Sequence, residues 1–533
     1  MRFSGATSAR RHCPGNNAAP HPGTVIATLT AADRPPTEGD WLGHPKGLVV
    51  LFLTETWERM SYYGMRSLLV LYMVKHLLVR PDVGAEVLGF SALRHALETA
   101  FGVLTPQALS SQIYGLYTGF VYLTPFFGGM LADRVLGRRR AVVVGAVFMA
   151  IGHFLMASER LFLVALMFLI VGNGCFKPNI STQVGGLYAP GDPRRDRAYS
   201  VFYVGVNLGA VLAPLICGTL GQVVGWHYGF GAAGVGMVLG LVIYLANQGK
   251  LPLDPPPETS PSAPIAATAA FVVGVPVGIV ALLWLLTLPP VVPLGLAVLV
   301  VAASVAWMVR LPREDRARVM ALAAACLVTA AFWAVYEQQG NTLQLWAEQS
   351  TRWPTIFGFT IPSTWYQSFN PFLIWLLVPL LNALWAWQAR RRREPTSLQK
   401  MALGCVVLGS GFLVMIVAAT DMAEGAKVSV LWLLASSVVF TIGEIYLSPV
   451  GLSFVTKVAP LRMVSMMMGV WYLSSFVGNY LTGYLGTYYE KMPHTRFFWM
   501  LAVIAGLAGL ALFAMNRPLD RIVGARDRHQ AGR

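Results

Sequence analysis

Charged residues are scarce in this chain. Only 12% of its 533 residues are Asp, Glu, Lys or Arg, and 55% are hydrophobic, whereas about a quarter of the residues in an ordinary soluble domain are charged. Too few polar side chains are available to cover a surface in water. The composition therefore excludes a soluble globular protein, and most of the chain is expected to lie in lipid.

Cysteine is also scarce, and the common metal and redox motifs are absent. The five cysteines lie far apart without a CxxC spacing, and the nine histidines form no HExxH motif, so no metal or redox site is expected. The sequence contains neither a G-x-S-x-G serine elbow nor a GxxxxGKS or GxxxxGKT phosphate loop. We therefore expect no enzymatic activity, no use of ATP, and no cofactor beyond a coupling ion.

The net charge of +15 does not indicate a nucleic-acid partner. The basic residues lie in short loops between apolar runs rather than in a patch with interleaved aromatics. The first forty or so residues are rich in Ala, Pro, Thr and Gly and lack an apolar stretch long enough for a signal peptide. They are interpreted either as a disordered cytoplasmic tail or as residues added by a start codon placed too far upstream.

Long apolar runs dominate the rest of the sequence, and a spanning helix needs about 20 mainly apolar residues. The runs fall at 47–74, 111–132, 140–157, 161–181, 198–219, 228–247, 265–288, 291–309, 318–341, 366–389, 398–420, 429–455, 464–487 and 495–515. They predict fourteen membrane helices as two six-helix bundles with an inserted hairpin. The predicted parts are a disordered tail at 1–45, a bundle at 46–248, a linker with the hairpin at 249–312, a bundle at 313–517 and a tail at 518–533.

The short loops indicate the orientation, because Lys and Arg are retained on the cytoplasmic side. Basic clusters occur in every second loop, at residues 134–140, 194–197, 250, 310–318, 390–400, 457–462 and from 517 onward. Both termini are therefore predicted to lie in the cytoplasm. Two bundles joined by a cytoplasmic stretch are typical of transporters whose solute site lies between them near the middle of the bilayer.

The loop between the second and third runs, residues 128–140, resembles the cytoplasmic loop motif of the major facilitator superfamily. Its glycines permit close helix approach, and its charged residues are expected to latch the two bundles together on the cytoplasmic side. The motif residues are Gly129, Asp133, Arg134, Gly137 and Arg138. The resemblance implies an all-α integral membrane protein with the major facilitator fold.

Several charged residues lie inside the apolar runs, although each costs about 2.5–3.5 kcal/mol on insertion scales. The first run carries a stripe formed by Glu55, Arg59, Tyr62 and Arg66. Spacings of four, three and four place these side chains on one helix face, and Glu58 and Tyr63 widen that polar face. The stripe is predicted to face water or polar partners rather than lipid.

The run from Glu55 to Gly64 resembles the ExxERFxYYG motif of the proton-dependent oligopeptide transporter family, with Met60 in place of Phe. Lys177, Pro178 and Asn179 are similar to the family's Lys-Pro-Asn helix, and the runs at 198–219, 318–341, 366–389 and 429–455 match further family patterns. The resemblance extends from about residue 46 to about residue 516. It implies a bacterial inner-membrane symporter that carries di- and tripeptides with protons and functions as a monomer in the lipid bilayer.

The charges on the two halves suit a zwitterionic substrate. Bases in the first half and acids in the second are separated as the carboxylate and the ammonium group of a peptide require. By resemblance, Arg59 and Lys177 bind the carboxylate, whereas Asn207, Asn370 and Glu444 bind the amino end. The expected substrate-binding residues are Arg59, Tyr62, Tyr63, Arg66, Tyr122, Lys177, Asn207, Trp333, Glu337, Asn370, Glu444, Trp471 and Ser475.

Proton coupling requires a carboxylate whose proton affinity changes between conformations, as it does when a cationic partner is gained or lost. By resemblance, Glu337 pairs with Arg66 to close the outer gate. A second set of proton-linked residues consists of Glu55, Glu58, Arg59 and Lys177. The sequence leaves open which glutamate carries the driving proton.

Other functions remain open. One alternative is a proton symporter of another small anion or zwitterion, such as nitrate or an amino-acid conjugate, and another is a peptide sensor that does not transport. The titratable gate argues against a sensor. The segment 343–365 is interpreted as a cap over the periplasmic entrance. The hairpin at 265–309 carries no intramembrane charge and is predicted to be peripheral.

Overall fold

The computed structural model describes residues 43–189, 191–254, 263–289, 291–422, 426–460 and 463–530. Almost all of the predicted N-terminal tail at 1–45 lies outside these residues. Each of the fourteen predicted apolar runs corresponds to a helix. Within the described residues, length and hydropathy mark nine helical stretches as able to cross a membrane. The first helix is not among the nine because its charged side chains interrupt the apolar run.

Six long helices form the first half of the molecule. They are α1 (Lys46–Tyr72), α4 (Pro106–Leu131), α5 (Arg138–Leu155), α6 (Phe162–Gly186), α7 (Arg194–Ala213) and α8 (Trp226–Ala246). The second half has six more, which are α11 (Arg313–Tyr336), α13 (Phe369–Arg390), α14 (Ser397–Thr420), α15 (Val430–Val458), α16 (Val464–Gly486) and α17 (His494–Gln530). The last helix continues through most of the predicted tail at 518–533.

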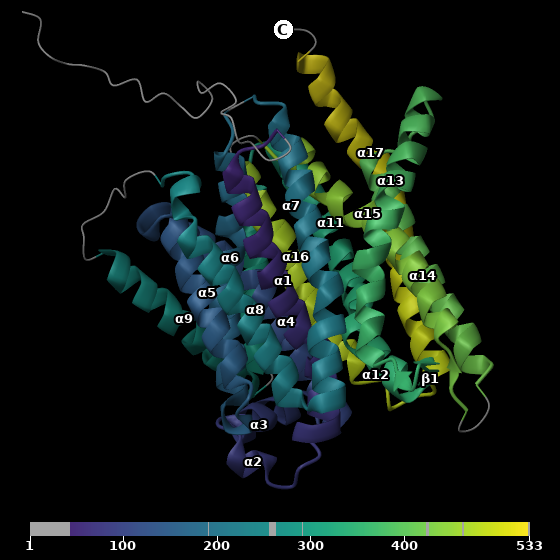
Figure 1. Ribbon diagram of the computed structural model, residues 1–533. Coiled ribbons are helices and arrows are strands. Elements are labelled where there is room, and N and C mark those ends of the chain that lie inside the picture. The colour runs from purple at the N-terminus through teal and green to yellow at the C-terminus, as the bar shows by residue number, and fades with distance from the viewer. Residues whose placement is uncertain are drawn as a thin grey trace, which may run out of the picture.

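The long helices run roughly side by side between two ends of the molecule (Figure 1). The start of α1 and the end of α17 lie at one end, which we call the terminal face. Three short helices that the sequence did not predict lie at the opposite end, the α12 face. They are α2 (Val83–Glu86), α3 (Phe90–Phe101) and α12 (Thr342–Gln349).

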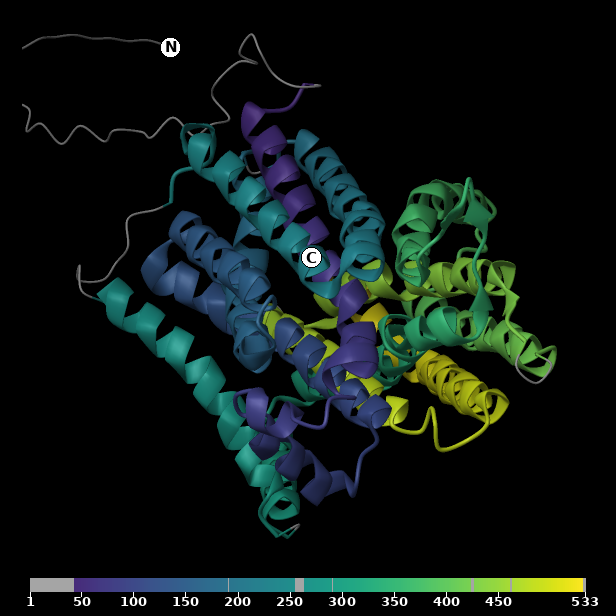
Figure 2. The ribbon, with the colours of Figure 1, turned by 60° about the horizontal axis from the view of Figure 1, so that its bottom comes forward.

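The inserted hairpin consists of α9 (Ala263–Leu286) and α10 (Val291–Val309). Figure 2 shows α9 along the edge of the first half. Only 11% of its most apolar stretch is buried, so the side chains of α9 mainly face the surrounding lipid. The hairpin is therefore peripheral, as the lack of intramembrane charges predicted.

The aromatic segment after α11 folds over the α12 face. After α12 it forms β1 (Thr351–Arg352), β2 (Thr355–Ile356) and β3 (Phe359–Thr360), followed by the helical turn η9 (Ser363–Ser368). Phe357 and Gly358 both have positive φ, as a two-residue type I′ hairpin turn between β2 and β3 requires. β1 pairs in parallel with β4 (Val428–Ser429), and the fully buried Trp346 packs edge-on against Phe498. The segment is thus fixed to the second half.

The two halves approach each other most closely where α4 crosses α16. A Cβ atom added to Gly115 would lie 2.7 Å from the Cα atom of Gly483 and 2.9 Å from the carbonyl oxygen of Asn479. Small residues allow such backbone contacts between membrane helices. The packing of α4 against α16 therefore leaves no room for a side chain at residue 115.

We expect Gly115→Leu to lower the thermal stability of the detergent-purified protein, because a side chain here forces α4 away from α16. Overpacking of this kind typically costs about 1–3 kcal/mol. Gly506→Leu is the matched control, since a Cβ atom at Gly506 meets nothing within 4 Å. Equal melting temperatures for the two variants would contradict the tight crossing.

Candidate functional site

A cavity of about 320 Å³ lies between the two halves. Its walls come from α1, α4, α6 and α7 on one side and from α11, α13, α15 and α16 on the other. Eleven of the predicted substrate-binding residues line it, namely Tyr63, Arg66, Tyr122, Lys177, Asn207, Trp333, Glu337, Asn370, Glu444, Trp471 and Ser475. Residues from eight predicted runs are thus brought together around one space.

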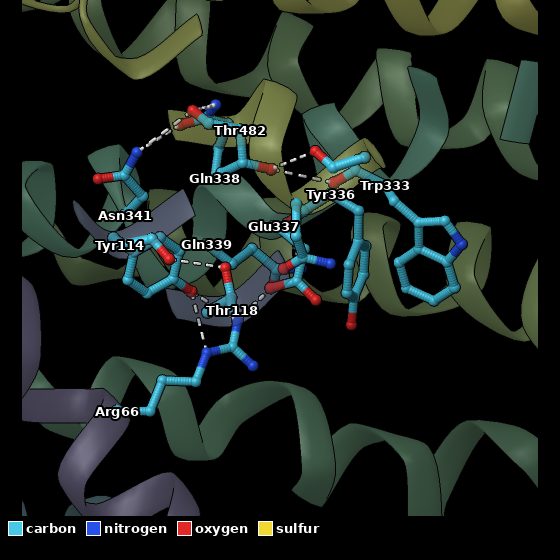
Figure 3. A network of polar contacts seen from close by, with 12 residues as sticks. Arg66, Tyr114, Thr118, Trp333, Tyr336, Glu337, Gln338, Gln339, Asn341 and Thr482 are labelled. Atoms are coloured by element: carbon cyan, nitrogen blue, oxygen red, sulfur yellow. Dashed lines mark hydrogen bonds and ion pairs between the residues drawn. The ribbon is translucent and has the colours of Figure 1, made fainter. Parts of the chain in front are cut away.

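Arg66 and Glu337 form an ion pair that joins α1 to the end of α11. The Arg66 guanidinium also donates to the hydroxyl oxygen of Tyr114 from Nε at 2.9 Å and from Nη2 at 2.7 Å. Figure 3 shows the three side chains converging. Only 3% of the Glu337 side chain and 11% of the Arg66 side chain are exposed, so each charge depends on the other for compensation.

Glu444 lies across the cavity and is held by neutral donors. The hydroxyl of Tyr336 donates to Glu444 at 2.6 Å, and Nδ2 of Asn370 donates to it at 2.8 Å. Among the described residues, no lysine or arginine lies within ion-pair distance of this carboxylate. Its negative charge is therefore available to a cationic group that enters the cavity.

Lys177 is the corresponding cation on the first half. Its Nζ lies 4.8 Å from the centre of the Tyr122 ring, and no carboxylate of the described part of the chain pairs with it. The aromatic ring stabilises the ammonium without neutralising it. Lys177 and Glu444 therefore present opposite, uncompensated charges to the same cavity.

Arg59 is placed differently from the prediction. It pairs with Glu58, with Nη2 to Oε1 at 2.7 Å, and with Glu55 at 3.2 Å. Arg59 and Tyr62 are 3% and 4% exposed, and neither lines the cavity in this conformation. Glu58 is the residue before Arg59, and Glu55 lies one helical turn away. These two acids bind the Arg59 guanidinium, so Arg59 does not face the substrate cavity.

Polar contacts between the halves gather at the α12 face. Glu348 of α12 accepts hydrogen bonds from Lys75 and Ser363 and, at 2.9 Å, from Nε2 of Gln222. The side-chain oxygen of Gln222 accepts in turn from the backbone N–H of Thr364 at 3.0 Å. We call these five residues the Glu348 network. Together with the Arg66–Glu337 pair, it closes the cavity toward the α12 face.

Two cavity residues indicate where the space opens. Tyr203 of α7 and Tyr472 of α16 line the cavity and are 49% and 46% exposed. Both helices begin at the terminal face, and both tyrosines lie in the half of their helix nearest to it. The cavity is thus closed at the α12 face and open toward the terminal face.

The major facilitator loop motif makes its described contacts with the first half and with the segment that follows α8. Asp133 pairs with Arg138 at 3.4 Å, and Gly137 takes the positive φ of 79° that ends the preceding helical turn. The side chain of Arg139 donates to the carbonyl oxygen of Pro252 at 2.8 Å. The latch between the halves that we predicted here is not among these contacts, because the cavity opens toward this face.

Some site residues escaped the sequence analysis. Tyr336 donates a hydrogen bond to Glu444, and Tyr114 accepts one from Arg66. Gln222 and Glu348 form a hydrogen bond that joins the two halves. Tyr336 directly precedes Glu337 in a polar run, which was a usable signal. Gln222 and Glu348 are 126 residues apart, and no local pattern indicates that they meet.

The chain is similar in sequence to known peptide transporters. The sequence profile of the POT family matches residues 139–500. Peptide transporter YePEPT of Yersinia enterocolitica subsp. palearctica is 36% identical over 474 residues, which cover 84% of this chain and 88% of the relative. The di-/tripeptide transporter of Lactococcus lactis subsp. cremoris is 33% identical over 514 residues, 92% of this chain and 98% of the relative.

Solved structures extend the similarity to the fold. A crystal structure of a mutant of peptide transporter POT in complex with alafosfalin superimposes with a TM-score of 0.76 at 34% identity, covering 93% of this chain and 99% of that chain. The match includes both halves and therefore shows the major facilitator fold. The chain belongs to the POT family of membrane transporters.

Proposed function

We propose that this protein is a secondary transporter that carries di- and tripeptides into the cell together with protons. The observation that carries the proposal is the pair of uncompensated charges, Lys177 and Glu444, that face one cavity between the two halves. Two relatives named as peptide or di-/tripeptide transporters support this substrate class. Family membership supports proton coupling.

The cavity suits a peptide held by its two ends. The ammonium group would bind to the Glu444 carboxylate. Nδ2 of Asn370 donates to that carboxylate, and the side-chain oxygen of Asn370 would accept a further hydrogen bond from the ammonium group. The carboxylate would pair with Lys177. Trp333, Trp471 and the tyrosines of the wall offer broad apolar faces for variable side chains.

The Arg66–Glu337 pair would connect proton binding to the conformational change. The pair forms while the α12 face is closed. Protonation of Glu337 removes its attraction for Arg66, and the closed state then loses a buried ion pair that spans the halves. Glu55 and Glu58 beside Arg59 form a second carboxylate set in the first half. Binding and release of protons at these groups would thus bias the two halves between opposite-facing states.

The orientation follows from the basic loops. The terminal face carries the clusters of Lys and Arg, so it would face the cytoplasm of a bacterial inner membrane. The cavity in this structure would then open to the cytoplasm, the side on which the substrate is released. Lys177 and Glu444, which would hold the two ends of a peptide, come from the two halves of the same chain, so the proposed site needs no second subunit.

Uptake into liposomes tests the proposed function. Purified protein is reconstituted, an inward proton gradient with a negative interior is imposed, and labelled dialanine is supplied outside. We expect accumulation that collapses when an uncoupler is added. Uptake of nitrate or of an amino-acid conjugate instead of any peptide would assign another solute, and peptide binding without uptake would indicate a sensor.

The Glu348 network provides a prediction about the closed face. Glu348→Ala removes the acceptor for Lys75, Gln222 and Ser363, and a lost hydrogen bond to a charged group is worth about 1.5–3 kcal/mol. We expect amide hydrogens of α12 to exchange roughly tenfold or more faster in the variant.

Glu86→Ala is the matched control for this experiment. Glu86 also lies at the α12 face, but it pairs with Arg80 inside the first half. The amide hydrogens of α12 should therefore exchange at the same rate in Glu86→Ala as in the unmodified protein. The same exchange rate in both variants would show that the Glu348 network does not hold the halves together.

A further inference from the structure

A second space lies outside the substrate cavity, between α5, α8 and the hairpin helix α9. This groove has a volume of about 950 Å³ and is at the terminal face. Figure 1 shows α9 on the outer side of the first half, next to α5 and α6. The groove is accessible from the membrane and is not used in the proposed transport cycle.

The walls of the groove are two apolar stripes that face each other. On α5 the stripe comprises Val143, Val144 and Phe148 below Arg140, and on α9 it comprises Ile265, Thr268, Ala269 and Val272. Spacings of three and four put each set on one helix face. From residue 140 to residue 148 an α-helix rises about 12 Å, close to half of the bilayer's hydrocarbon thickness of about 30 Å. The groove is therefore as deep as one lipid leaflet.

The rim of the groove is basic. Arg140 is exposed and lines the groove, and no hydrogen bond or ion pair of its side chain occurs within the described part of the chain. Arg139 differs, because its guanidinium is held by the carbonyl oxygens of Leu251 and Pro252. Asp254 is an acid on the rim, and it accepts the backbone N–H of Arg139 at 2.8 Å. Arg140 thus remains as an uncompensated charge above an apolar slot.

We propose that this groove binds an anionic phospholipid of the leaflet at the terminal face. The phosphate lies against the Arg140 guanidinium, and one acyl chain lies between the stripes of α5 and α9. Basic pockets between membrane helices are typical sites for anionic headgroups, and the apolar walls select against a free phosphate ion. The lipid thereby links the peripheral hairpin to the first half.

Native mass spectrometry of the detergent-purified full chain tests this site. Dioleoyl phosphatidylglycerol and dioleoyl phosphatidylcholine are titrated separately. We expect the protein to retain phosphatidylglycerol in preference to phosphatidylcholine, and Arg140→Gln to reduce phosphatidylglycerol binding about fivefold, the equivalent of about 1 kcal/mol for one basic residue. Arg140→Lys should retain the preference, because the positive charge remains.

Two further variants distinguish a bound lipid from other possible ligands of the groove. Ala269→Phe fills the slot without changing the charge, and we expect it to reduce phosphatidylglycerol binding as well. Arg391→Gln, on the second half, is the charge-matched control and should bind like the unmodified protein. Equal binding of both lipids, equal loss in Arg391→Gln, or displacement of phosphatidylglycerol by inorganic phosphate would overturn the proposal.

Discussion

Glu337→Gln is expected to abolish proton-driven accumulation of peptide while exchange of peptide across the membrane continues. The glutamine keeps the shape of the side chain but cannot carry the negative charge that pairs with Arg66. Moving one charge down 100 mV is worth about 2.3 kcal/mol, so one proton per neutral peptide supports roughly forty-fold accumulation. We expect the accumulation ratio of the variant to fall to about one.

The measurement compares net uptake and counterflow of labelled dialanine in the same liposomes. Glu314→Gln, at the opposite end of α11, controls for the loss of a glutamate from this helix and should accumulate peptide normally. If Glu337→Gln accumulates dialanine as well as the unmodified protein, another carboxylate carries the driving proton. Glu55 and Glu58 would then be the candidates to test.

Glu444→Gln is expected to weaken binding of dialanine by about 10- to 150-fold. The carboxylate is the acceptor for the peptide ammonium in our proposal, and hydrogen bonds to charged groups are worth about 1.5–3 kcal/mol. N-acetylated dialanine lacks the ammonium group, so we expect it to bind the unmodified protein more weakly than dialanine does. We expect Glu444→Gln to change its affinity little. Isothermal titration of both ligands measures this difference directly.

The variant Tyr336→Phe is a graded control for this result. It removes the hydroxyl that donates to Glu444 at 2.6 Å but leaves the carboxylate in place. Its effect on dialanine should be smaller than that of Glu444→Gln. Equal losses of affinity for dialanine and for its acetylated form in Glu444→Gln would show that Glu444 supports the cavity wall instead of binding the amino end.

The sequence predicted the long helices well because lipid imposes a simple rule. Each spanning helix needs about 20 apolar residues, and each predicted run contains one helix. The short helices α2, α3 and α12 have no such signal, and the two-residue strands around Phe357 are too short for any periodicity. Their positions depend on tertiary packing, such as that of Trp346 in the second half.

The site was predictable where the charges themselves marked it. Arg66 and Glu337 stood out as charges within apolar runs, and they meet across 271 residues of sequence. Arg59 and its partners Glu55 and Glu58 lie on the same helix, but the spacing alone could not show whether Arg59 pairs with these acids or faces the substrate cavity. Helical spacing identifies the residues that share a face, whereas the partners on other helices depend on the packing of the whole bundle.

The most direct test of coupled transport measures protons and peptide together. Liposomes that contain the protein and a trapped pH-sensitive dye are given an inward gradient of dialanine, with no imposed proton gradient. Our account predicts that peptide entry acidifies the interior of the liposomes and that vesicles with Glu337→Gln show no acidification. Entry of dialanine without a change of internal pH in the unmodified protein would contradict proton-coupled transport.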